Sequence, residues 1–373
     1  MVRYKFLLGS VLCWAFFAQG CVHGDLDDCP PMVQYAVAFT YTNHVWNKDR
    51  FYDDVKTINL YVFDANNLVY TTTTELSPYE EKFNIPLDLP MGNYTILAWG
   101  NVSTSGPFTI TPANFIKGKT TLSEARLTLQ KTRGDLNDTR LEKLFFGEIH
   151  ATVPLYVSRI DTIPLTNDTK NVRVVLHWNT KNVSLGSKVD HSNVVVRLNG
   201  RNAKYKFDNS NDALSVAYAP YMSYPSDSIL KAGVGTTVRD GNNPLRIDYA
   251  DLEKFTRLAD FTETTVYDFT TLRLFADLPL NLSIEYWQPE GNNQYIKKPV
   301  HEADIINRYT GFPYLFAEDM RIAENQWQNS FDKYDFYRVD VFIVQEESDT
   351  FVTGSILIKD WWVVKDDTSA GMK

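Results

Sequence analysis

The chain has 373 residues, of which 44% are hydrophobic and 22% are charged. These proportions exclude large-scale disorder, and the length predicts more than one domain. The formal net charge of −9 argues against a nucleic-acid-binding protein, which would carry a basic face, and against docking on anionic lipid through a basic patch.

The first twenty residues are predicted to be a secretory signal peptide. Arg3 and Lys5 form a short positive segment at the N-terminus. The apolar run that follows, from Phe6 to Ala18, is too short to span a bilayer as a stable helix. Residues 1–20 are therefore expected to be absent from the mature protein.

Cys21 is the candidate site of lipid attachment. It directly follows the small residue Gly20, where a bacterial lipoprotein peptidase would cut, and the diacylglycerol is attached to the sulfur of the new N-terminal residue. The alternative is an ordinary signal peptide with a chance Cys, but no convincing Ala-x-Ala site follows. We predict a lipoprotein signal peptide, with residues 21–32 as an acidic tether.

The cysteine count argues against several classes of enzyme. Cys13 leaves with the signal peptide and Cys21 carries the lipid, which leaves Cys29 as the possible free thiol. A single thiol forms neither an internal disulfide nor a Cys-rich zinc site. The adjacent Asp27 and Asp28 disfavour a thiolate, so we do not expect Cys29 to be catalytic.

The first half of the mature chain reads as short strands joined by turns. Val33–Tyr41 alternates apolar and small or polar residues, which predicts a half-buried strand. Thr57–Phe63 is apolar on both faces, as expected deep in a sandwich. Tyr94–Gly100 follows a turn and predicts another buried strand. Further strands are expected at residues 68–70, 144–147 and 151–157.

The second half continues the series. Val172–Trp178 alternates and places His177 on the outer face of its strand. Tyr337–Val344 and Phe351–Lys359 predict a hairpin. Helical periodicity is rare, and the two modest candidates are Asp251–Asp260 and Glu302–Arg308. Further strands are expected at residues 194–198, 204–207, 271–275 and 282–286.

Many short strands with regular turns predict an all-β protein built from β-sandwiches. The turn-rich segment Ser158–Lys170 is a plausible domain boundary. We therefore expect an N-terminal β-sandwich over residues 33–168 and a C-terminal β-sandwich over residues 169–373.

The chemistry-bearing motifs are mostly absent. The sequence lacks G-x-S-x-G, Walker, H-E-x-x-H and G-x-G-x-x-G motifs, and no two His have metal-ligand spacing. Asp208–Asp212 resembles the start of a calcium loop, but Ala219 occupies the position of the bidentate Glu, so a polar turn is the better interpretation. Of the adjacent Trp361 and Trp362, at least one is expected in the core, and the other is a candidate for stacking on a sugar. No cofactor or metal ion is predicted.

The chain resembles the anchor subunits of Bacteroidales type V fimbriae, which belong to the fimbrillin superfamily. The resemblance extends from Cys21 nearly to the C-terminus. Four segments carry it: Asp27-Asp28-Cys29-Pro30, Ile58-Asn59-Leu60-Tyr61-Val62-Phe63-Asp64, Leu89-Pro90-Met91-Gly92-Asn93-Tyr94-Thr95-Ile96-Leu97-Ala98-Trp99-Gly100-Asn101 and Ile356-Leu357-Ile358-Lys359-Asp360-Trp361. The acidic run from Asp25 to Asp28 also resembles the signal that exports Bacteroidales lipoproteins to the outside of the outer membrane.

The resemblance implies two tandem transthyretin-like β-sandwich domains and a non-enzymatic role. The protein would be a surface-exposed lipoprotein of the outer membrane that tethers a fimbrial shaft subunit, a fimbrillin, by β-strand complementation. In shaft proteins, a protease cutting after Arg or Lys removes an N-terminal strand. Lys48 and Arg50 follow the first strand here, but cutting there would release the protein from its lipid, so we predict no such cleavage.

Two other interpretations remain open. The first is a surface lipoprotein or fimbrial tip subunit that binds glycan or a host protein. A neighbouring gene for a shaft fimbrillin would favour the anchor, and a neighbouring glycan-import locus would favour the binder. The second is an enzyme on a β-sandwich, which a buried, pKa-shifted pair of carboxylates in an open cleft would indicate.

Overall fold

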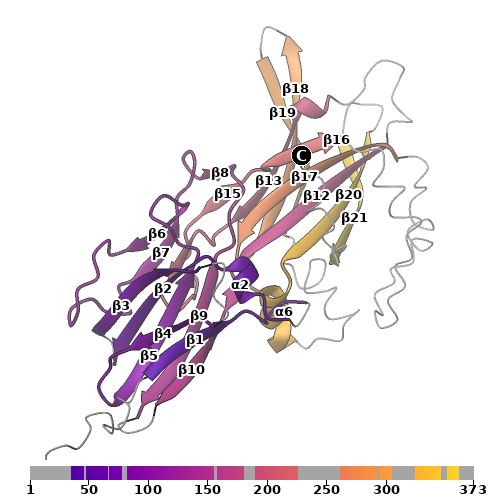
Figure 1. Cartoon of the computed structure of the whole chain (residues 1–373). Coiled ribbons are helices and arrows are strands. Elements are labelled where there is room, and N and C mark those ends of the chain that lie inside the picture. The colour runs from indigo at the N-terminus through magenta and orange to yellow at the C-terminus, as the bar shows by residue number, and fades with distance from the viewer. Residues whose placement is uncertain are drawn as a thin grey trace, which may run out of the picture.

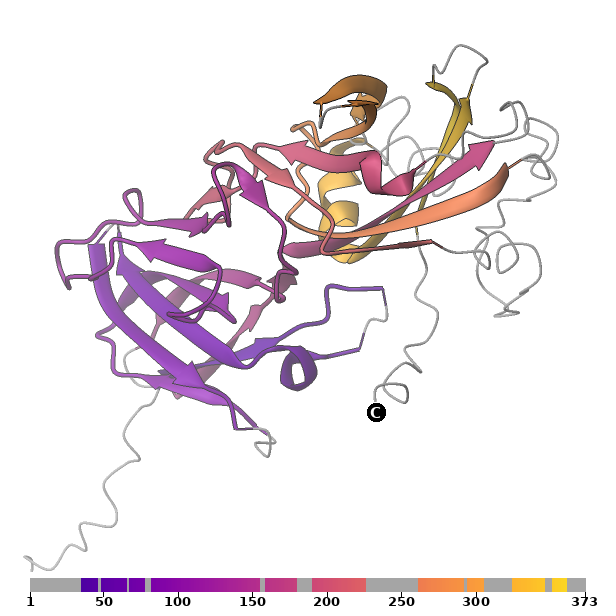
Figure 2. The ribbon, with the colours of Figure 1, turned by 90° about the horizontal axis from the view of Figure 1, so that it is seen from above.

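The computed structural model describes residues 35–45, 48–65, 67–77, 82–154, 158–179, 190–225, 261–291, 294–304, 324–345 and 351–360. Within these ranges strands predominate, in five sheets, and the helices are short (Figures 1 and 2). The prediction of an all-β fold is confirmed.

The N-terminal half forms a sandwich of two sheets, which we call the N-terminal sandwich. One sheet has the order β10-β1-β4 and the other the order β11-β9-β5-β2-β3. Their facing side chains form one apolar core, because alternate residues of each strand point inward. The strands are β1 (Tyr35–Thr40), β2 (Thr57–Asp64), β3 (Asn67–Glu75), β4 (Asn84–Leu87), β5 (Gly92–Gly100), β9 (Phe145–Val153), β10 (Arg159–Pro164) and β11 (Thr166–Asn167).

The second face of the five-stranded sheet is covered as well. A small sheet with the order β14-β7-β6 packs on it, formed by β6 (Phe108–Thr111), β7 (Arg126–Leu129) and β14 (Lys204–Lys206). Tyr61 of β2 and Trp99 of β5 meet Phe207 there, with ring centroids 4.8 and 6.1 Å away. These three layers explain why β2 is buried on both faces, as its sequence predicts.

The C-terminal half forms a second sandwich, the C-terminal sandwich, of two five-stranded sheets. One has the order β16-β17-β12-β20-β21 and the other the order β19-β18-β13-β15-β8. The strands are β8 (Leu136–Asn137), β12 (Thr169–Asn179), β13 (Val194–Gly200), β15 (Val216–Tyr218), β16 (Met222–Pro225), β17 (Phe261–Leu272), β18 (Asn281–Gly291), β19 (Gln294–Asp304), β20 (Phe336–Gln345) and β21 (Phe351–Asp360).

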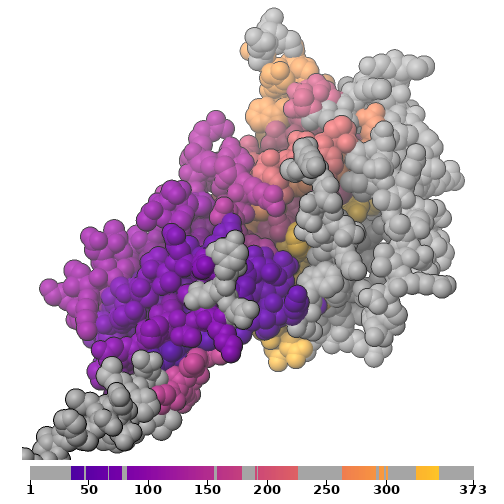
Figure 3. All heavy atoms as spheres, viewed as in Figure 1, coloured from indigo at the N-terminus to yellow at the C-terminus, as the bar shows by residue number. Residues whose placement is uncertain are grey.

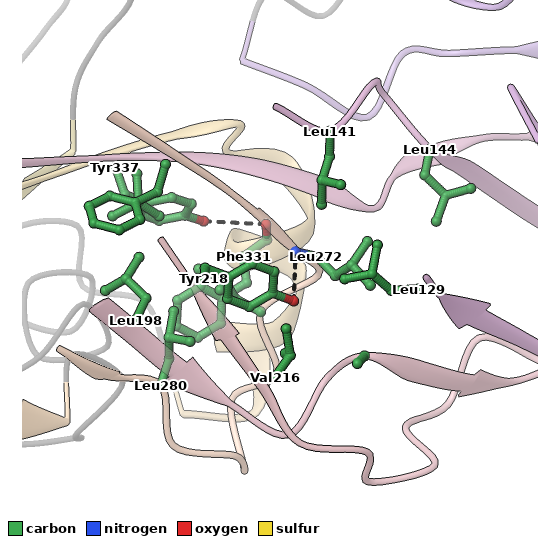
Figure 4. Close-up of a cluster of buried hydrophobic side chains, with 14 of the residues drawn as sticks. Leu129, Leu141, Leu144, Leu198, Val216, Tyr218, Leu272, Leu280, Phe331 and Tyr337 are labelled. Carbon is green, nitrogen blue, oxygen red and sulfur yellow. Dashed lines mark hydrogen bonds between the residues drawn. The ribbon is translucent and has the colours of Figure 1, made fainter. Parts of the chain in front are cut away.

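Short strands cross between the two halves. β8, which precedes β9 in the chain, pairs with β15, and β14, which follows β13, pairs with β7. One continuous apolar cluster therefore spans both sandwiches. Figure 4 shows part of it, with Leu129, Leu141 and Leu144 in the same buried cluster as Val216 and Leu272.

Several local predictions are wrong in instructive ways. The two strands expected around residues 144–157 are one continuous strand, β9. The polar residues Glu148 and His150 suggest a break, but they lie within β9, where Glu148 is half-buried and His150 is exposed to solvent. The strand expected at residues 271–275 instead ends at Leu272, as part of β17. Glu302 lies in β19, not in a helix. The helix expected at Asp251–Asp260 falls outside the described residues.

The helical segments of the described residues are α2 (Phe51–Asp54), the 3-10 turns at His191–Asn193 and Glu324–Gln326, and α6 (Trp327–Lys333). α2 and α6 lie near the junction between the sandwiches (Figure 1). α6 buries Trp327 and Phe331 against the shared core, and Tyr337 donates a hydrogen bond to the Phe331 carbonyl (3.3 Å). With only 7 residues, α6 is too short to show a periodicity in the sequence.

Candidate functional site

The predicted lipid site, Cys21, lies outside the described residues, as do Cys29 and the predicted acidic tether of residues 21–32. The first described element after them is β1. How β1 is held therefore decides how firmly the folded protein is connected to its N-terminal segment.

β1 lies in the middle of its sheet. It pairs in parallel with β10 and antiparallel with β4. Val37 and Phe39 point into the core of the N-terminal sandwich and are at most 5% exposed. At the start of the strand, the Tyr35 hydroxyl donates a hydrogen bond to Asp161 of β10 (2.8 Å). β1 is thus an integral strand with neighbours on both sides.

β1 also runs toward the C-terminal sandwich. The strand begins at Tyr35, at the far end of the N-terminal sandwich, and ends next to the junction (Figures 1 and 2). There the Tyr41 hydroxyl donates a hydrogen bond to Asp335, which precedes β20 (3.0 Å). Burial raises the pKa of Tyr41, and the neighbouring Asp335 raises it further, so Tyr41 remains a neutral donor. The segment that follows β1 is therefore bonded directly to the second half of the chain.

The loop after β1 is tied down around Asp49. Its carboxylate accepts hydrogen bonds from the backbone N–H groups of Tyr41 and Phe51 (both 2.9 Å). The Arg50 backbone N–H in turn donates to the Tyr41 carbonyl (2.9 Å). The two candidate cleavage positions, after Lys48 and after Arg50, thus flank a residue that fixes the backbone on both sides.

Polar side chains cluster where the two sandwiches meet, and we call this set the junction cluster: Tyr41, Asn167, Asp168, Lys170, Arg273, Asp332 and Asp335. Asp335 accepts hydrogen bonds from Tyr41, from Asn167 (3.0 Å) and from the Lys170 ammonium (3.4 Å). The side chain of Lys170 is completely buried, and it also donates to the Asp332 carbonyl (3.0 Å). Charged hydrogen bonds of this kind are stronger than neutral ones.

Arg273 and Asp332 form the second part of the junction cluster. The guanidinium donates two hydrogen bonds to the Asp332 carboxylate (both 2.7 Å) and one to the Asn209 carbonyl (3.1 Å). Burial lowers the pKa of Arg273, but Asp332 and Asp168 outweigh that effect and raise it above its ordinary value. A bidentate pair in this setting fixes α6 against the end of β17.

The junction cluster was not among the sites predicted from the sequence, although the sequence contains a signal for it. Val172, Leu176 and Trp178 point into the core, and Lys170 and Asp168 stand in the same alternation. A Lys and an Asp at core-facing positions of a strand need buried partners. The partners themselves lie more than 100 residues away, so the sequence alone does not identify them.

The sequence predicts only that His177 lies on the outer face of its strand, and the structure adds that this face is buried. His177 points away from the core strip of β12, but it is only 2% exposed. Its Nε2 lies 2.8 Å from Asp340, and its ring stacks on Phe342. Burial raises the pKa of Asp340, but hydrogen bonds from His177 and Arg338 outweigh burial and hold it below its ordinary value. His177, Asp340 and Arg338 therefore form a second buried polar cluster on this face of the sheet.

The described residues give no support for a metal site. Asp208 accepts hydrogen bonds from the backbone and hydroxyl of Ser210, which forms the polar turn predicted there. Asp212 is bound by Arg126 (2.8 Å) and Lys204 (2.9 Å). Within the described ranges, no group of three or more His, Cys, Asp or Glu side chains is placed to hold a metal ion. Trp361 and Trp362 fall outside these ranges.

A hairpin formed by β18 and β19 projects from the C-terminal sandwich (Figures 1 and 3). Trp287 pairs with Lys297, and Pro289 pairs with Tyr295, so these four side chains share one face. Trp287 is 37% exposed and Tyr295 is 52% exposed. Exposed aromatic side chains on a projecting hairpin form a surface suited to binding.

No helix among the described residues combines the length and the hydropathy needed to cross a bilayer.

Comparisons with known proteins place this fold among solved structures. The chain is similar to the fimbrial anchor protein Mfa2 from Porphyromonas gingivalis, with 18% identity, a TM-score of 0.59 and coverage of 88% of this chain and 97% of that one. A candidate adhesin from Bacteroides thetaiotaomicron shares 18% identity with a TM-score of 0.64, covering 90% of this chain and 98% of that one. A candidate polysaccharide-binding protein from the same organism shares 21% identity with a TM-score of 0.62, covering 89% and 98%.

A search of curated proteins gave no match. The family of fimbrillin-A associated anchor proteins Mfa1 and Mfa2, however, matches residues 26–367, which is nearly the whole chain. The resemblance found in the sequence is confirmed, and the chain belongs to the family of fimbrillin-A associated anchor proteins.

Proposed function

We propose that this protein is a non-enzymatic lipoprotein of the outer membrane that anchors a fimbrial shaft to the cell surface. The lipid on Cys21 would hold the N-terminus of the mature protein in the outer membrane, and the folded part would bind a shaft fimbrillin. Family membership across residues 26–367 carries the fimbrial part of this proposal. A lipid anchor needs no membrane-spanning helix, although stable anchoring by lipid takes more than one acyl chain.

The setting of β1 supports the anchoring role. A pull on the tether acts at Tyr35 and along the strand, while the resisting contacts lie toward Tyr41 and Asp335. A force along β1 acts on all of its backbone hydrogen bonds to β10 and β4 at the same time, rather than breaking them one after another. The removal of β1 would uncover the core residues on which Val37 and Phe39 pack and would disconnect the lipid, so we propose that β1 is kept in the mature protein.

Assembly with the shaft is proposed to use β-strand complementation, in the tandem transthyretin-like domains that the family resemblance implies. A complementing strand needs an open sheet edge. β3, β16 and β21 are among the strands that stand at the ends of their sheets in the described residues. β16 and β21 belong to the C-terminal sandwich, whereas Tyr35, the first described residue after the predicted tether, belongs to the N-terminal sandwich.

The test compares wild type with Cys21→Ala in native outer membranes. The membranes are solubilised gently, the protein is pulled down, and the co-purifying proteins are identified by mass spectrometry. We expect a fimbrillin to co-purify with the wild type and fimbriae to be shed into the medium by the variant. Fimbriae that stay attached without Cys21, together with no co-purifying fimbrillin, would overturn the proposal.

The alternative is a surface lipoprotein or fimbrial tip subunit that binds glycan or a host protein. The observation that favours it is the exposed pair Trp287 and Tyr295 on the projecting hairpin, since aromatic rings are effective binding surfaces. One similar structure belongs to a candidate polysaccharide-binding protein. Titration of the purified protein with surface glycans, followed by Trp fluorescence, would distinguish this alternative from the anchor.

A further inference from the structure

Asp168 is the one member of the junction cluster whose charge has no satisfactory partner among the described residues. It is completely buried, at the point where the chain passes from β11 to β12. Within the described part of the chain, neither of its carboxylate oxygens has a hydrogen-bond partner. The cation paired with it is Arg273, whose Nε lies 3.9 Å from Asp168 Oδ1. A buried carboxylate normally has several donors, so this environment fits a neutral carboxyl group better than an ionised one.

The groups that face Asp168 come from every element packed around it. Arg273 follows β17 and gives both of its short bonds to Asp332 of α6, so little of its charge is left for Asp168. Lys170 of β12 is already bonded to Asp332 and Asp335. Tyr205 of β14 also faces Asp168, and so does Asn209, without meeting hydrogen-bond geometry. With every group ionised, the cluster holds one more carboxylate than cations.

We propose that Asp168 makes the junction between the two sandwiches a proton-controlled joint: the joint is closed while Asp168 is a neutral acid and loosens when Asp168 ionises. Burial raises the pKa of Asp168 to about 7, an effect that Asp332 reinforces and Arg273 opposes. This inference concerns the folding of the chain and does not depend on its proposed role in fimbriae.

The direction of the pH effect follows from proton linkage. In the closed joint the carboxyl group of Asp168 keeps its proton up to about pH 7, whereas a solvent-exposed Asp loses its proton near the ordinary pKa of 3.8. The closed form therefore binds more protons between these two values, and the closed joint becomes less stable as pH rises through that window. Above the window the effect levels off. This is opposite to the behaviour of a carboxylate held in a good salt bridge.

Hydrogen exchange at the junction tests the proposal in the full-length protein in detergent. The reporters are the backbone amides of Asp168 and Asn171, which donate to the carbonyls of Leu144 (2.7 Å) and Asp335 (2.8 Å). After correction for intrinsic exchange, we expect their opening to increase about tenfold or more between pH 5 and pH 8. The amides of Ile96 and Ile149, paired between β5 and β9 in the N-terminal sandwich, serve as the reference. Equal protection of the junction amides at both pH values would overturn the proposal without any variant.

Asp168→Asn provides the second arm, because Asn is a neutral group of the same shape. We expect its junction amides to be insensitive to pH and, at pH 8, better protected than those of the wild type. The exposed Asp138→Asn should follow the wild type at both pH values. If Asp168→Asn is instead less protected than the wild type at pH 8, the carboxylate is a stabilising partner of Arg273 and the proposal fails.

Discussion

The hydroxyl of Tyr41 donates a hydrogen bond to Asp335 across 294 positions of the sequence (3.0 Å). Tyr41 follows the first strand of the N-terminal sandwich, and Asp335 leads into β20 of the C-terminal sandwich. This bond, with those from Asn167 and Lys170 to the same carboxylate, joins the segment after β1 to the C-terminal sandwich.

Tyr41→Phe removes this bond and keeps the ring, which packs edge-on against Phe145. Because the lost bond is made to a charged acceptor, we expect the free energy of unfolding to fall by about 1–2 kcal/mol. Tyr295→Phe is the control, since that side chain is 52% exposed, and it should cost less than about 0.5 kcal/mol. Urea denaturation followed by Trp fluorescence measures both. Equal values for the two variants would show that the bond contributes nothing.

Lys170→Met leaves the carboxylate of Asp335 and the carbonyl of Asp332 without their buried cation. Breaking a buried pair on one side is strongly destabilising, and we expect a loss of about 3 kcal/mol. Adding Asp335→Asn should recover part of it, because the unpaired charge is then gone. Lys204→Met, at the partly exposed pair with Asp212, should cost less than about 1 kcal/mol. A Lys170→Met protein as stable as the Lys204→Met protein would contradict this account.

The lowered pKa of Asp340 predicts that the folded protein loses stability in acid. Its folded-state pKa lies below the ordinary value of 3.8, so its stabilising contribution is present above that value and is lost as pH falls through the lower, folded-state pKa. Asp340→Asn should be less stable than the wild type by about 3 kcal/mol at pH 7. The difference should shrink as the pH is lowered below about 4. Thermal unfolding from neutral pH into acid checks this, with the exposed Asp88→Asn expected to track the wild type throughout.

The strands could be predicted from the sequence better than the contacts between them. The runs of β2, β5 and β12 alternate or stay apolar over many residues, so local chemistry determines their form. Nothing in the sequence indicates that β14 pairs with β7 or that β8 pairs with β15, because β14 and β8 are only three and two residues long. The burial of His177 could not be predicted for a related reason: it depends on Asp340 and Phe342, which lie on a strand more than 160 positions later.

Trp287→Ala tests the projecting hairpin. The side chain is partly exposed, so we expect the free energy of unfolding to change by less than about 1 kcal/mol. Affinity for the surface partner should fall at least about tenfold, because a few exposed aromatic residues carry most of the energy of an interface. Met91→Ala, 64% exposed in the N-terminal sandwich, is the control and should bind normally. Lost glycan binding with intact co-purification of fimbrillin would favour the alternative function, whereas lost co-purification would place the shaft on this hairpin.

Asp49 is predicted to protect the chain from cleavage between β1 and α2. Its Oδ1 accepts the backbone N–H groups of Tyr41 and Phe51, and a protease needs that backbone free and extended in its active site. Asp49→Ala removes both bonds, so trypsin should cut after Arg50 roughly tenfold faster than in the wild type, as a loss of more than about 1.4 kcal/mol of local stability implies. Asp49→Asn keeps an acceptor at the same position and should remain resistant, which separates the effect of the bonds from that of the charge.

The same region decides whether β1 is kept in the cell. We expect N-terminal sequencing of the surface form to find a chain that still contains β1, with its lipid at Cys21. A surface chain that starts at Asp49 or Phe51 would contradict this expectation. It would mean that β1, although paired on both sides and bonded to Asp335 through Tyr41, is removed and leaves an open groove between β10 and β4. The tether would then be a processed leader, and the attachment to the membrane would have to lie elsewhere.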